Sequence, residues 1–166
     1  MIYEFCRKRV SIGFAVAAAL LVHMFALFAA AQSAGAPASQ AVSLDYGFFK
    51  ERVQPIFLKR RSPDHARCYS CHEQSRMESR LRLETLAPGA SSWNEEQSRR
   101  NFQTLSRLVV PGEPLKSRFL IHPLAPQAGG HLSHGGGWQF ESQNDPDWQN
   151  MAAWVRGQKA GGSSRP

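Results

Sequence analysis

The feature that most constrains this chain is a run of five residues, Cys68-Tyr69-Ser70-Cys71-His72. Two cysteines separated by two residues and followed at once by a histidine form the attachment signature of a c-type haem. On a helix the two thiols lie about one turn apart, which suits their addition to two vinyl groups on one porphyrin edge. The imidazole that follows can turn under the iron as the proximal ligand. The sequence therefore predicts Cys68 and Cys71 as covalent haem attachment residues and His72 as an axial ligand of the iron.

A C-x-x-C pair also occurs in zinc sites, in thioredoxin-like redox pairs and as a local disulfide. A structural zinc site needs four ligands, and the one other cysteine, Cys6, lies in the N-terminal leader. His65 and His72 could complete a Cys2His2 set, but His72 directly abuts Cys71, which is awkward for chelation. A thioredoxin-like pair needs a βαβ alternation, which the sequence lacks. We therefore favour haem and keep a zinc or disulfide module as an alternative.

The first 31 residues form a targeting segment. A basic stretch, Arg7-Lys8-Arg9, precedes an almost wholly apolar run from residue 10 to 31 that ends in small residues. This pattern is typical of a signal peptide, and the run is also long enough to span a bilayer as an N-terminal anchor helix. Either reading puts the rest of the chain in the periplasm, outside the cell, or on the inner membrane facing the periplasm, where c-type haem is attached in bacteria. Residues 32–42 are predicted to be a linker.

The formal net charge is +7, of which +2 lies in residues 1–31, so the remainder carries +5. A basic surface favours encounter with acidic redox partner proteins. The basic residues are scattered and form no helical stripe interleaved with exposed aromatics, so we predict no nucleic-acid partner.

Residues 43–157 are predicted to form a single helical domain, followed by a disordered tail at 158–166. Asp45 is a candidate N-cap for a first helix, which Pro55 should bend or end. A short helix that carries the attachment motif is expected from Cys68 to about Met77. Another helix is expected from Ser92, in a capping box with Glu95, to about Val109. Asp145 is the predicted N-cap of the last helix, which Gly157 should end. Residues 80–91 read as a short extended segment. The predicted apolar faces comprise Phe48, Phe49, Val53, Ile56 and Phe57, then Phe102, Leu105 and Leu108, then Trp148, Met151, Ala152, Trp154 and Val155.

From about residue 45 to 157 the chain resembles the small class I cytochrome c domain, and more narrowly the type found in secreted planctomycete and acidobacterial proteins. The resemblance rests on the attachment motif, on the helix at 49–57 before it, on the segment 110–117 and on the closing helix at 147–155. It implies an all-α fold that wraps one haem c, with one-electron transfer as the activity. Many such domains supply a distal methionine from a Met-Pro-Pro stretch, and here no methionine lies between Met77 and Met151.

The glycine-rich stretch at 126–137 offers histidines in place of that methionine. His134 stands directly before three glycines, where backbone can approach a porphyrin closely, and is the predicted distal ligand. His131 and His122 are the alternatives, and Met151 is expected to be a core residue. Two imidazole ligands predict a lower reduction potential than a histidine–methionine pair.

These patterns predict an electron carrier and not an enzyme, with one haem c as its cofactor. Two other readings remain open. One is a haem peroxidase or gas-sensing module with an open distal site. The other is a non-haem module that holds zinc or a disulfide.

Overall fold

The computed structural model describes residues 41–74 and 79–161, which belong to a compact unit that begins at Ala41. The predicted signal or anchor segment lies outside these residues, as does nearly all of the predicted linker. In the part of the chain that is described, no helix has both the length and the apolarity needed to cross a membrane.

The first helical region consists of three consecutive segments: α2 (Tyr46–Phe48), the π-helical η1 (Phe49–Val53) and the 3-10 helix η2 (Gln54–Leu58). The Asp45 carboxylate accepts a hydrogen bond from the backbone N–H of Phe48 at 2.7 Å, so the predicted N-cap is confirmed. Pro55 changes the helix type without ending the helical path, because it stands in the first turn of η2, where its missing N–H is not needed.

The second long helix, α4 (Glu95–Ser106), begins later and ends earlier than the sequence pattern predicted. Its capping box joins Asn94 to Gln97, so the predicted pair of Ser92 and Glu95 is wrong. Trp93 explains the shift. Its ring is buried against Tyr69, and the helix starts only after this anchored residue.

The remaining helical elements are short except for the last one. They are α3 (Cys68–His72), η3 (Pro114–Lys116), α5 (Arg118–Ile121), η4 (Pro126–Ala128) and α6 (Pro146–Val155). In the described residues, the β-type pairing consists of two isolated bridges, Glu73 with Leu83 and Leu124 with Phe140. The predicted extended segment at 80–91 is reduced to one of these bridges. The predicted all-α class is thus confirmed at the level of a helical chain with almost no strand.

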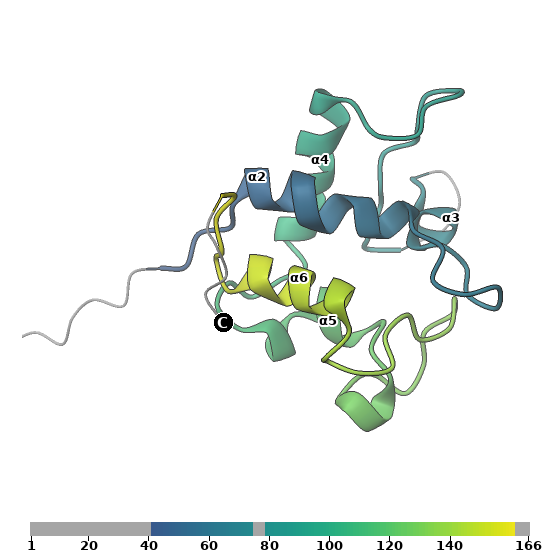
Figure 1. Ribbon diagram of the computed structural model, residues 1–166, viewed down its shortest axis with the longest axis vertical. Helices are drawn as coiled ribbons and strands as arrows, with labels where there is room; N and C mark the ends of the chain where they lie inside the picture. The colour runs from purple at the N-terminus through teal and green to yellow at the C-terminus, as the bar shows by residue number, and fades with distance from the viewer. Residues whose placement is uncertain (1–40, 75–78, 162–166) are drawn as a thin grey trace, which may run out of the picture. The chain divides into compact units, whose positions relative to one another are not determined.

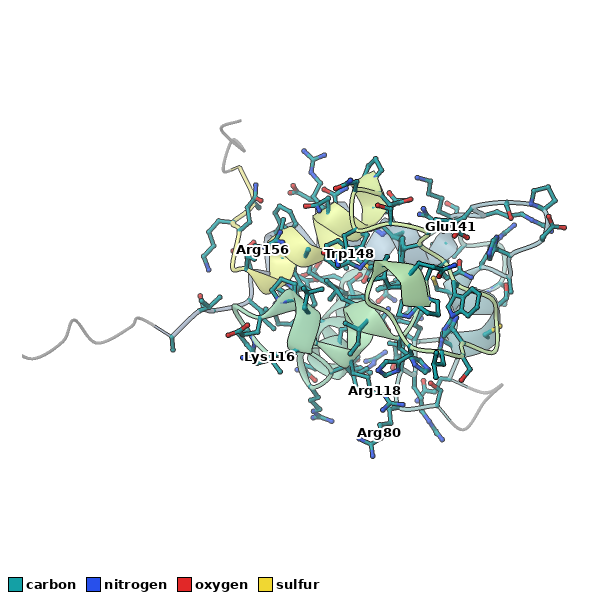
Figure 2. The ribbon with its side chains drawn as sticks, turned by 90° about the horizontal axis from the view of Figure 1, so that it is seen from below. Arg80, Lys116, Arg118, Glu141, Trp148 and Arg156 are labelled. Atoms are coloured by element: carbon teal, nitrogen blue, oxygen red, sulfur yellow. The ribbon has the colours of Figure 1, made fainter. Side chains whose placement is uncertain are left out.

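The core forms where α6 packs against η1 (Figure 1). Asp145 caps α6 and Gly157 follows it with a φ of +87°, as predicted. The indole of Trp154 lies 5.3 Å from the ring of Phe49 between centroids. Trp148 is 1 % exposed and lies among the surrounding side chains (Figure 2).

All five predicted apolar residues of the first helical region are buried, and so are all five of α6. Of the predicted α4 face, Leu105 is buried, and Phe102 and Leu108 pack against the core.

The two ends of the described domain meet beside α2. The Lys159 ammonium donates to Ser43 Oγ at 2.8 Å, and the backbone N–H of Ala160 donates to the Asp45 carboxylate at 3.2 Å. The indole N–H of Trp154 donates to the Asp45 carbonyl at 3.0 Å. Asp45 therefore joins the start of the domain both to α6 and to the first residues of the predicted tail.

This arrangement predicts a pH-dependent contribution from Asp45. The N–H of Phe48 is the main cause that lowers the pKa of Asp45 below its ordinary 3.8, partial burial opposes it, and the Ala160 N–H assists. Because the folded-state pKa is lowered, the stabilisation is complete above the unfolded pKa and is lost as pH falls through the folded one. Asp45→Ala should lower the free energy of unfolding by about 1 kcal/mol at pH 7, as for other N-caps. Urea titrations at several pH values would measure this.

Asp45→Asn is the matched control, since an amide oxygen can still accept the cap hydrogen bond but carries no charge. Its stability should not depend on protonation at residue 45, whereas the difference between wild type and Asp45→Ala should shrink at low pH. An Asp45→Ala deficit that stays constant through acid pH would contradict the ionised cap.

Candidate functional site

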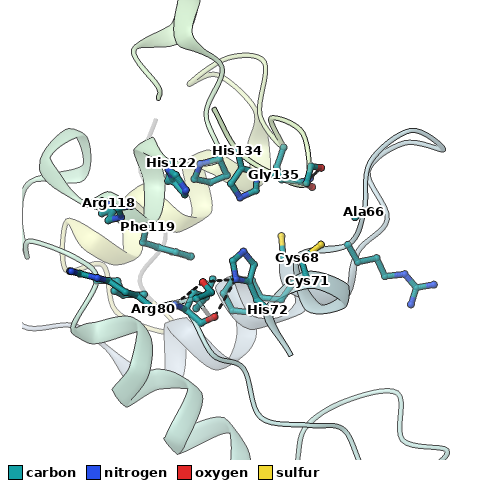
Figure 3. Close-up of a pocket in the computed structure, with 18 of the residues that line it drawn as sticks. Ala66, Cys68, Cys71, His72, Arg80, Arg118, Phe119, His122, His134 and Gly135 are labelled. Carbon is teal, nitrogen blue, oxygen red and sulfur yellow. Dashed lines mark hydrogen bonds between the residues drawn. The ribbon is translucent and has the colours of Figure 1, made fainter. Parts of the chain in front are cut away.

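The motif residues lie on α3, and both thiols are free and half-buried. In Figure 3 the sulfur atoms of Cys68 and Cys71 lie beside His72 at one edge of a cavity. Burial raises the pKa of the Cys68 thiol to about 11. Cys68 therefore stays a neutral thiol near pH 7 and is not an activated thiolate nucleophile.

The His72 ring is oriented through its Nδ1 atom. That atom lies 3.2 Å from the carbonyl oxygen of Leu81 and 3.1 Å from the hydroxyl of Ser79. A carbonyl only accepts, so Nδ1 donates to it and the unprotonated Nε2 is left for another partner. Burial lowers the pKa of His72, opposed by the hydrogen bond to Leu81 and assisted by the nearby His134. The ring is thus neutral near pH 7, as a metal-ligating imidazole must be.

The Leu81 carbonyl reaches His72 because the chain returns beside the end of α3. The backbone N–H of Leu83 donates to the His72 carbonyl at 2.7 Å, and the N–H of Gln74 donates to the Leu83 carbonyl at 2.8 Å. Leu83 is fully buried, so the core holds this returning segment in place. The segment 79–83 therefore supports the imidazole from behind.

The cavity in front of His72 has a volume of about 490 Å³ and lies between α3 and the segments that follow α4. Its inner wall is apolar and belongs to the core. The described residues that line it are Phe57, Ala66, Arg67, Cys68, Cys71, His72, Ser79, Arg80, Leu81, Leu108, Arg118, Phe119, His122, Pro123, His134, Gly135, Gly136, Gln139, Phe140 and Met151.

The opposite wall is a loop whose two ends are joined by backbone hydrogen bonds. The N–H of Ala125 donates to the Phe140 carbonyl at 2.8 Å, and the N–H of Gln139 donates to the Pro123 carbonyl at 2.8 Å. Gly130 permits the closure, because a Cβ atom at this position would lie 1.7 Å from the Leu124 carbonyl oxygen. The loop is therefore a closed unit that presents Gly135 and Gly136 to the cavity.

His134 lies on this loop and faces His72 across the cavity (Figure 3). The two ring centroids are 6.2 Å apart and the ring planes differ by 27°. Nδ1 of His134 lies 2.6 Å from the carbonyl oxygen of Gly137, which has a φ of +78°. A carbonyl only accepts, so Nδ1 of His134 is the donor and Nε2 is the ring nitrogen left for another partner.

The two alternative histidines are engaged with each other. Nδ1 of His122 lies 2.8 Å from Nδ1 of His131, so one ring donates to the other. The His122 ring also lines the cavity, 5.2 Å from that of His134 and nearly perpendicular to it. Burial lowers the pKa of His122, and the charges of His134 and Arg118 add to the effect. His131 does not line the cavity, and its backbone carbonyl accepts from the Trp138 indole at 3.1 Å.

Cys68, Cys71, His72, His134 and His122 thus line one cavity, and His131 lies behind His122. Sequence reasoning missed the cavity-lining role of Arg80, Arg118 and Gln139. No sequence pattern marked them, because Arg118 and Gln139 are far from the motif along the chain and Arg80 is one of several scattered basic residues. Met151 is 1 % exposed, as expected of a core residue, and its side chain also forms part of the cavity wall.

The described residues contain no cluster of three or more His, Cys, Asp or Glu side chains arranged to hold a metal ion on their own. Comparisons with family models, with curated proteins and with solved structures found no match to this chain.

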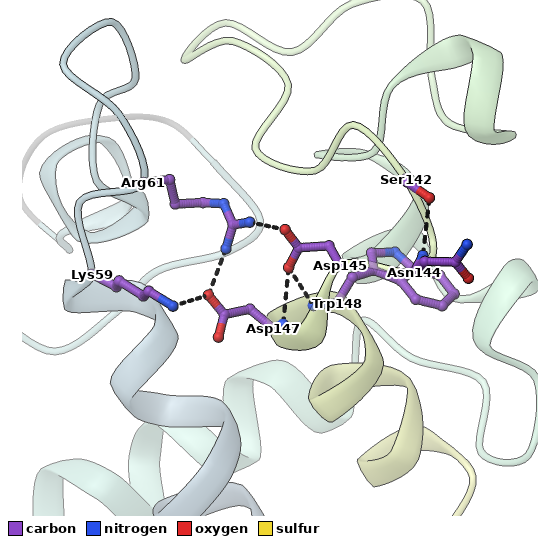
Figure 4. A network of polar contacts seen from close by, with 7 residues as sticks. All are labelled: Lys59, Arg61, Ser142, Asn144, Asp145, Asp147 and Trp148. Atoms are coloured by element: carbon purple, nitrogen blue, oxygen red, sulfur yellow. Dashed lines mark hydrogen bonds and ion pairs between the residues drawn. The ribbon is translucent and has the colours of Figure 1, made fainter.

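A polar network beside the cavity holds the loop that leads to the attachment motif. The Arg61 guanidinium pairs with Asp145 and, at 2.6 Å, with Asp147, both at the start of α6 (Figure 4). It also lies 4.5 Å above the ring of Phe140, which lines the cavity. Lys59 pairs with Asp147 at 2.7 Å from a more exposed position. Arg61 therefore joins the loop before Cys68 to both α6 and the cavity wall.

Arg61→Ala should lower the free energy of unfolding by about 1.5–3 kcal/mol, because it leaves the Asp145 carboxylate without its charged donor and leaves Asp147 with Lys59 alone. Lys59→Ala removes the same charge from a side chain that is 57 % exposed, compared with 15 % for Arg61. Its cost should stay within about 0.5 kcal/mol. Urea unfolding at one pH compares them, and equal losses in the two variants would contradict this role for Arg61.

Proposed function

We propose that this protein is a c-type cytochrome that transfers single electrons through one haem c. Thioether bonds from Cys68 and Cys71 would hold the haem, and His72 and His134 would be its axial ligands. The observation that carries the proposal is the facing pair of imidazoles, 6.2 Å apart between ring centres, beside two free thiols.

The separation of the two rings fits one metal ion between them. A first-row metal binds an imidazole nitrogen at about 2.0–2.1 Å, and the ring centre lies about 1 Å further along the same line. Two such ligands on opposite sides of one ion therefore place their ring centres about 6 Å apart. Both Nδ1 atoms are held by backbone carbonyl groups, and such a second shell is typical of metal-ligating histidines.

The cavity also suits the porphyrin ring of the proposed haem. Its volume of about 490 Å³ lies within the range of about 300–1,000 Å³ in which proteins hold cofactors and similar ligands. Phe57, Phe119 and Phe140 supply the apolar surface that a porphyrin needs. Gly135 and Gly136 line the cavity on the side of His134, and Gly136 is so close to the thiols that a Cβ atom on it would be in van der Waals contact with Cys71 Sγ, at 3.7 Å.

When bound, the haem supplies one-electron exchange at its iron, and the protein sets the potential. Two imidazoles lack the thioether that raises the potential of histidine–methionine cytochromes, so a lower potential follows. The excess of basic residues outside the leader suits acidic redox partner proteins, with association that weakens as salt is added. The proposed location is the periplasm, or the outer face of the inner membrane if the leader is retained as an anchor.

The first test is covalent attachment. Protein produced in cells that carry the c-type maturation machinery should gain the mass of one haem, and Cys68→Ser combined with Cys71→Ser should abolish the gain. Ser106→Ala is the control for a substitution outside the cavity and should gain the mass of one haem. Ser106 is the last residue of α4 and does not line the cavity. A wild-type protein without added mass would contradict the proposal and favour the zinc or disulfide module.

The second test concerns His134. In the reduced wild-type protein both axial positions are expected to be filled, so carbon monoxide should bind slowly. His134→Ala should increase the rate of carbon monoxide binding by about tenfold or more, because a ligand no longer has to leave first. His131→Ala is the matched control and should bind at nearly the wild-type rate. Stopped-flow absorbance measures all three.

Fast carbon monoxide binding in the wild type, unchanged by His134→Ala, would favour the alternative of a peroxidase or gas-sensing module. If His131→Ala increased the rate of carbon monoxide binding and His134→Ala did not, the distal ligand would be His131 and not His134.

A further inference from the structure

The charged side chains that line the cavity are all positively charged. Arg67, Arg80 and Arg118 line it, and no aspartate or glutamate of the described residues does. Elsewhere in the domain, many basic side chains are in ion pairs, such as Arg61 with Asp145 and Arg100 with Glu84. The described residues supply no ion-pair partner to the three cavity arginines. The lining therefore suits a ligand that carries negative charge.

Two of these arginines lie at the edge away from the thiols. In Figure 3 the His72 and His134 rings lie between Cys68 and Cys71 on one side and Arg80 and Arg118 on the other. Figure 2, from another direction, shows Arg80 and Arg118 on the same side of the domain. Arg67 directly precedes Cys68 and belongs to the edge with the thiols. The cavity thus has a thiol edge and an arginine edge.

The backbone at both arginines is held firmly. Arg80 lies between Ser79 and Leu81, whose hydroxyl and carbonyl oxygens are hydrogen-bond partners of His72 Nδ1. Arg118 is the first residue of α5 and follows Ser117, which is fully buried and accepts from the backbone N–H of Val110 at 2.9 Å. Both arginines line the cavity and are exposed, and in Figure 2 both lie at the surface of the domain.

We propose that Arg80 and Arg118 bind the two propionate carboxylates of the haem, an inference that rests on the proposed function. The two vinyl groups and the two propionates of the porphyrin lie on opposite edges. Thioether bonds to Cys68 and Cys71 at the thiol edge therefore direct the propionates to the arginine edge. Guanidinium groups suit this role, because their planar donors match a carboxylate in pairs and they stay charged at every working pH.

This pairing gives the two arginines a measurable effect on the iron. A positive charge nearby disfavours the extra positive charge of the oxidised haem, so its loss should favour oxidation and lower the midpoint potential. The same charge keeps the propionates ionised, so its loss should raise their pKa values. Both guanidinium groups are exposed, so the effect on the potential should decrease as salt is added.

The experiment uses the matured protein with its haem attached and compares Arg118→Gln, Arg80→Gln, the double variant and Arg67→Gln. Arg67→Gln is the matched control, because it makes the same charge change at the thiol edge. Intact mass first establishes that each variant carries one haem. Redox titration followed by absorbance, at several pH values and two salt concentrations, then gives the midpoint potential.

At low salt, Arg118→Gln and Arg80→Gln should each shift the equilibrium between reduced and oxidised protein about threefold to tenfold toward the oxidised form. The double variant should shift it further. The inflection in the plot of potential against pH should move to higher pH, which a merely structural role would not produce. Arg118→Lys should recover part of the shift, and Arg67→Gln should leave both readouts near wild type.

Haem-loaded variants with wild-type potentials and pH inflections would overturn the inference and leave the proposed function intact. An equal shift in Arg67→Gln would also overturn it, because the effect would then be one of net charge and not of propionate pairing. A wild-type protein that gains no haem mass would instead overturn the proposed function itself.

Discussion

The geometry of this site depends on two hydrogen bonds that hold imidazole rings from behind. Nδ1 of His72 donates to the Leu81 carbonyl, and Nδ1 of His134 donates to the Gly137 carbonyl. Each bond uses Nδ1 as the donor and leaves Nε2 as the nitrogen for another partner, so two such nitrogens belong to one cavity. Because both acceptors are backbone atoms, the orientation of each ring depends on the path of the main chain and not on another mobile side chain.

The helical core and the cavity that holds the two imidazoles share several side chains. The first helical region and α6 bury their aromatic residues against each other, and Phe57, Phe140 and Met151 belong both to that core and to the cavity wall. A short helix such as α3 has little stability of its own, since isolated helices of this length are marginal in water. Its position is set by the returning segment at 79–83 and by the packing of Tyr69 against Trp93.

Much of the helical framework could be predicted because local rules determine it. Asp45 and Asp145 are N-caps followed by apolar residues at helical spacing, and both caps have the predicted role. The start of α4 could not be derived in the same way. Two overlapping cap patterns exist there, and the choice of Asn94 depends on the burial of Trp93 against a distant residue. Tertiary packing decided between two locally acceptable starts.

The same distinction between local sequence rules and tertiary packing applies to the candidate site. Cys68, Cys71 and His72 follow from one contiguous motif whose spacing carries the chemistry. The facing position of His134 could be predicted only as a hypothesis, because it depends on how the loop from 125 to 140 closes. The arginine edge had no sequence signal at all, since Arg80 and Arg118 come together only through the return of the chain beside α3 and the placement of α5.

The most direct test of the central claim is near-infrared magnetic circular dichroism of the oxidised, matured wild-type protein. This measurement reports which atoms bind the iron axially. The account predicts the charge-transfer band of a low-spin haem with two imidazole ligands, as expected for His72 and His134. A band characteristic of thioether ligation, a high-spin spectrum with one axial position open, or no haem signal at all would contradict it.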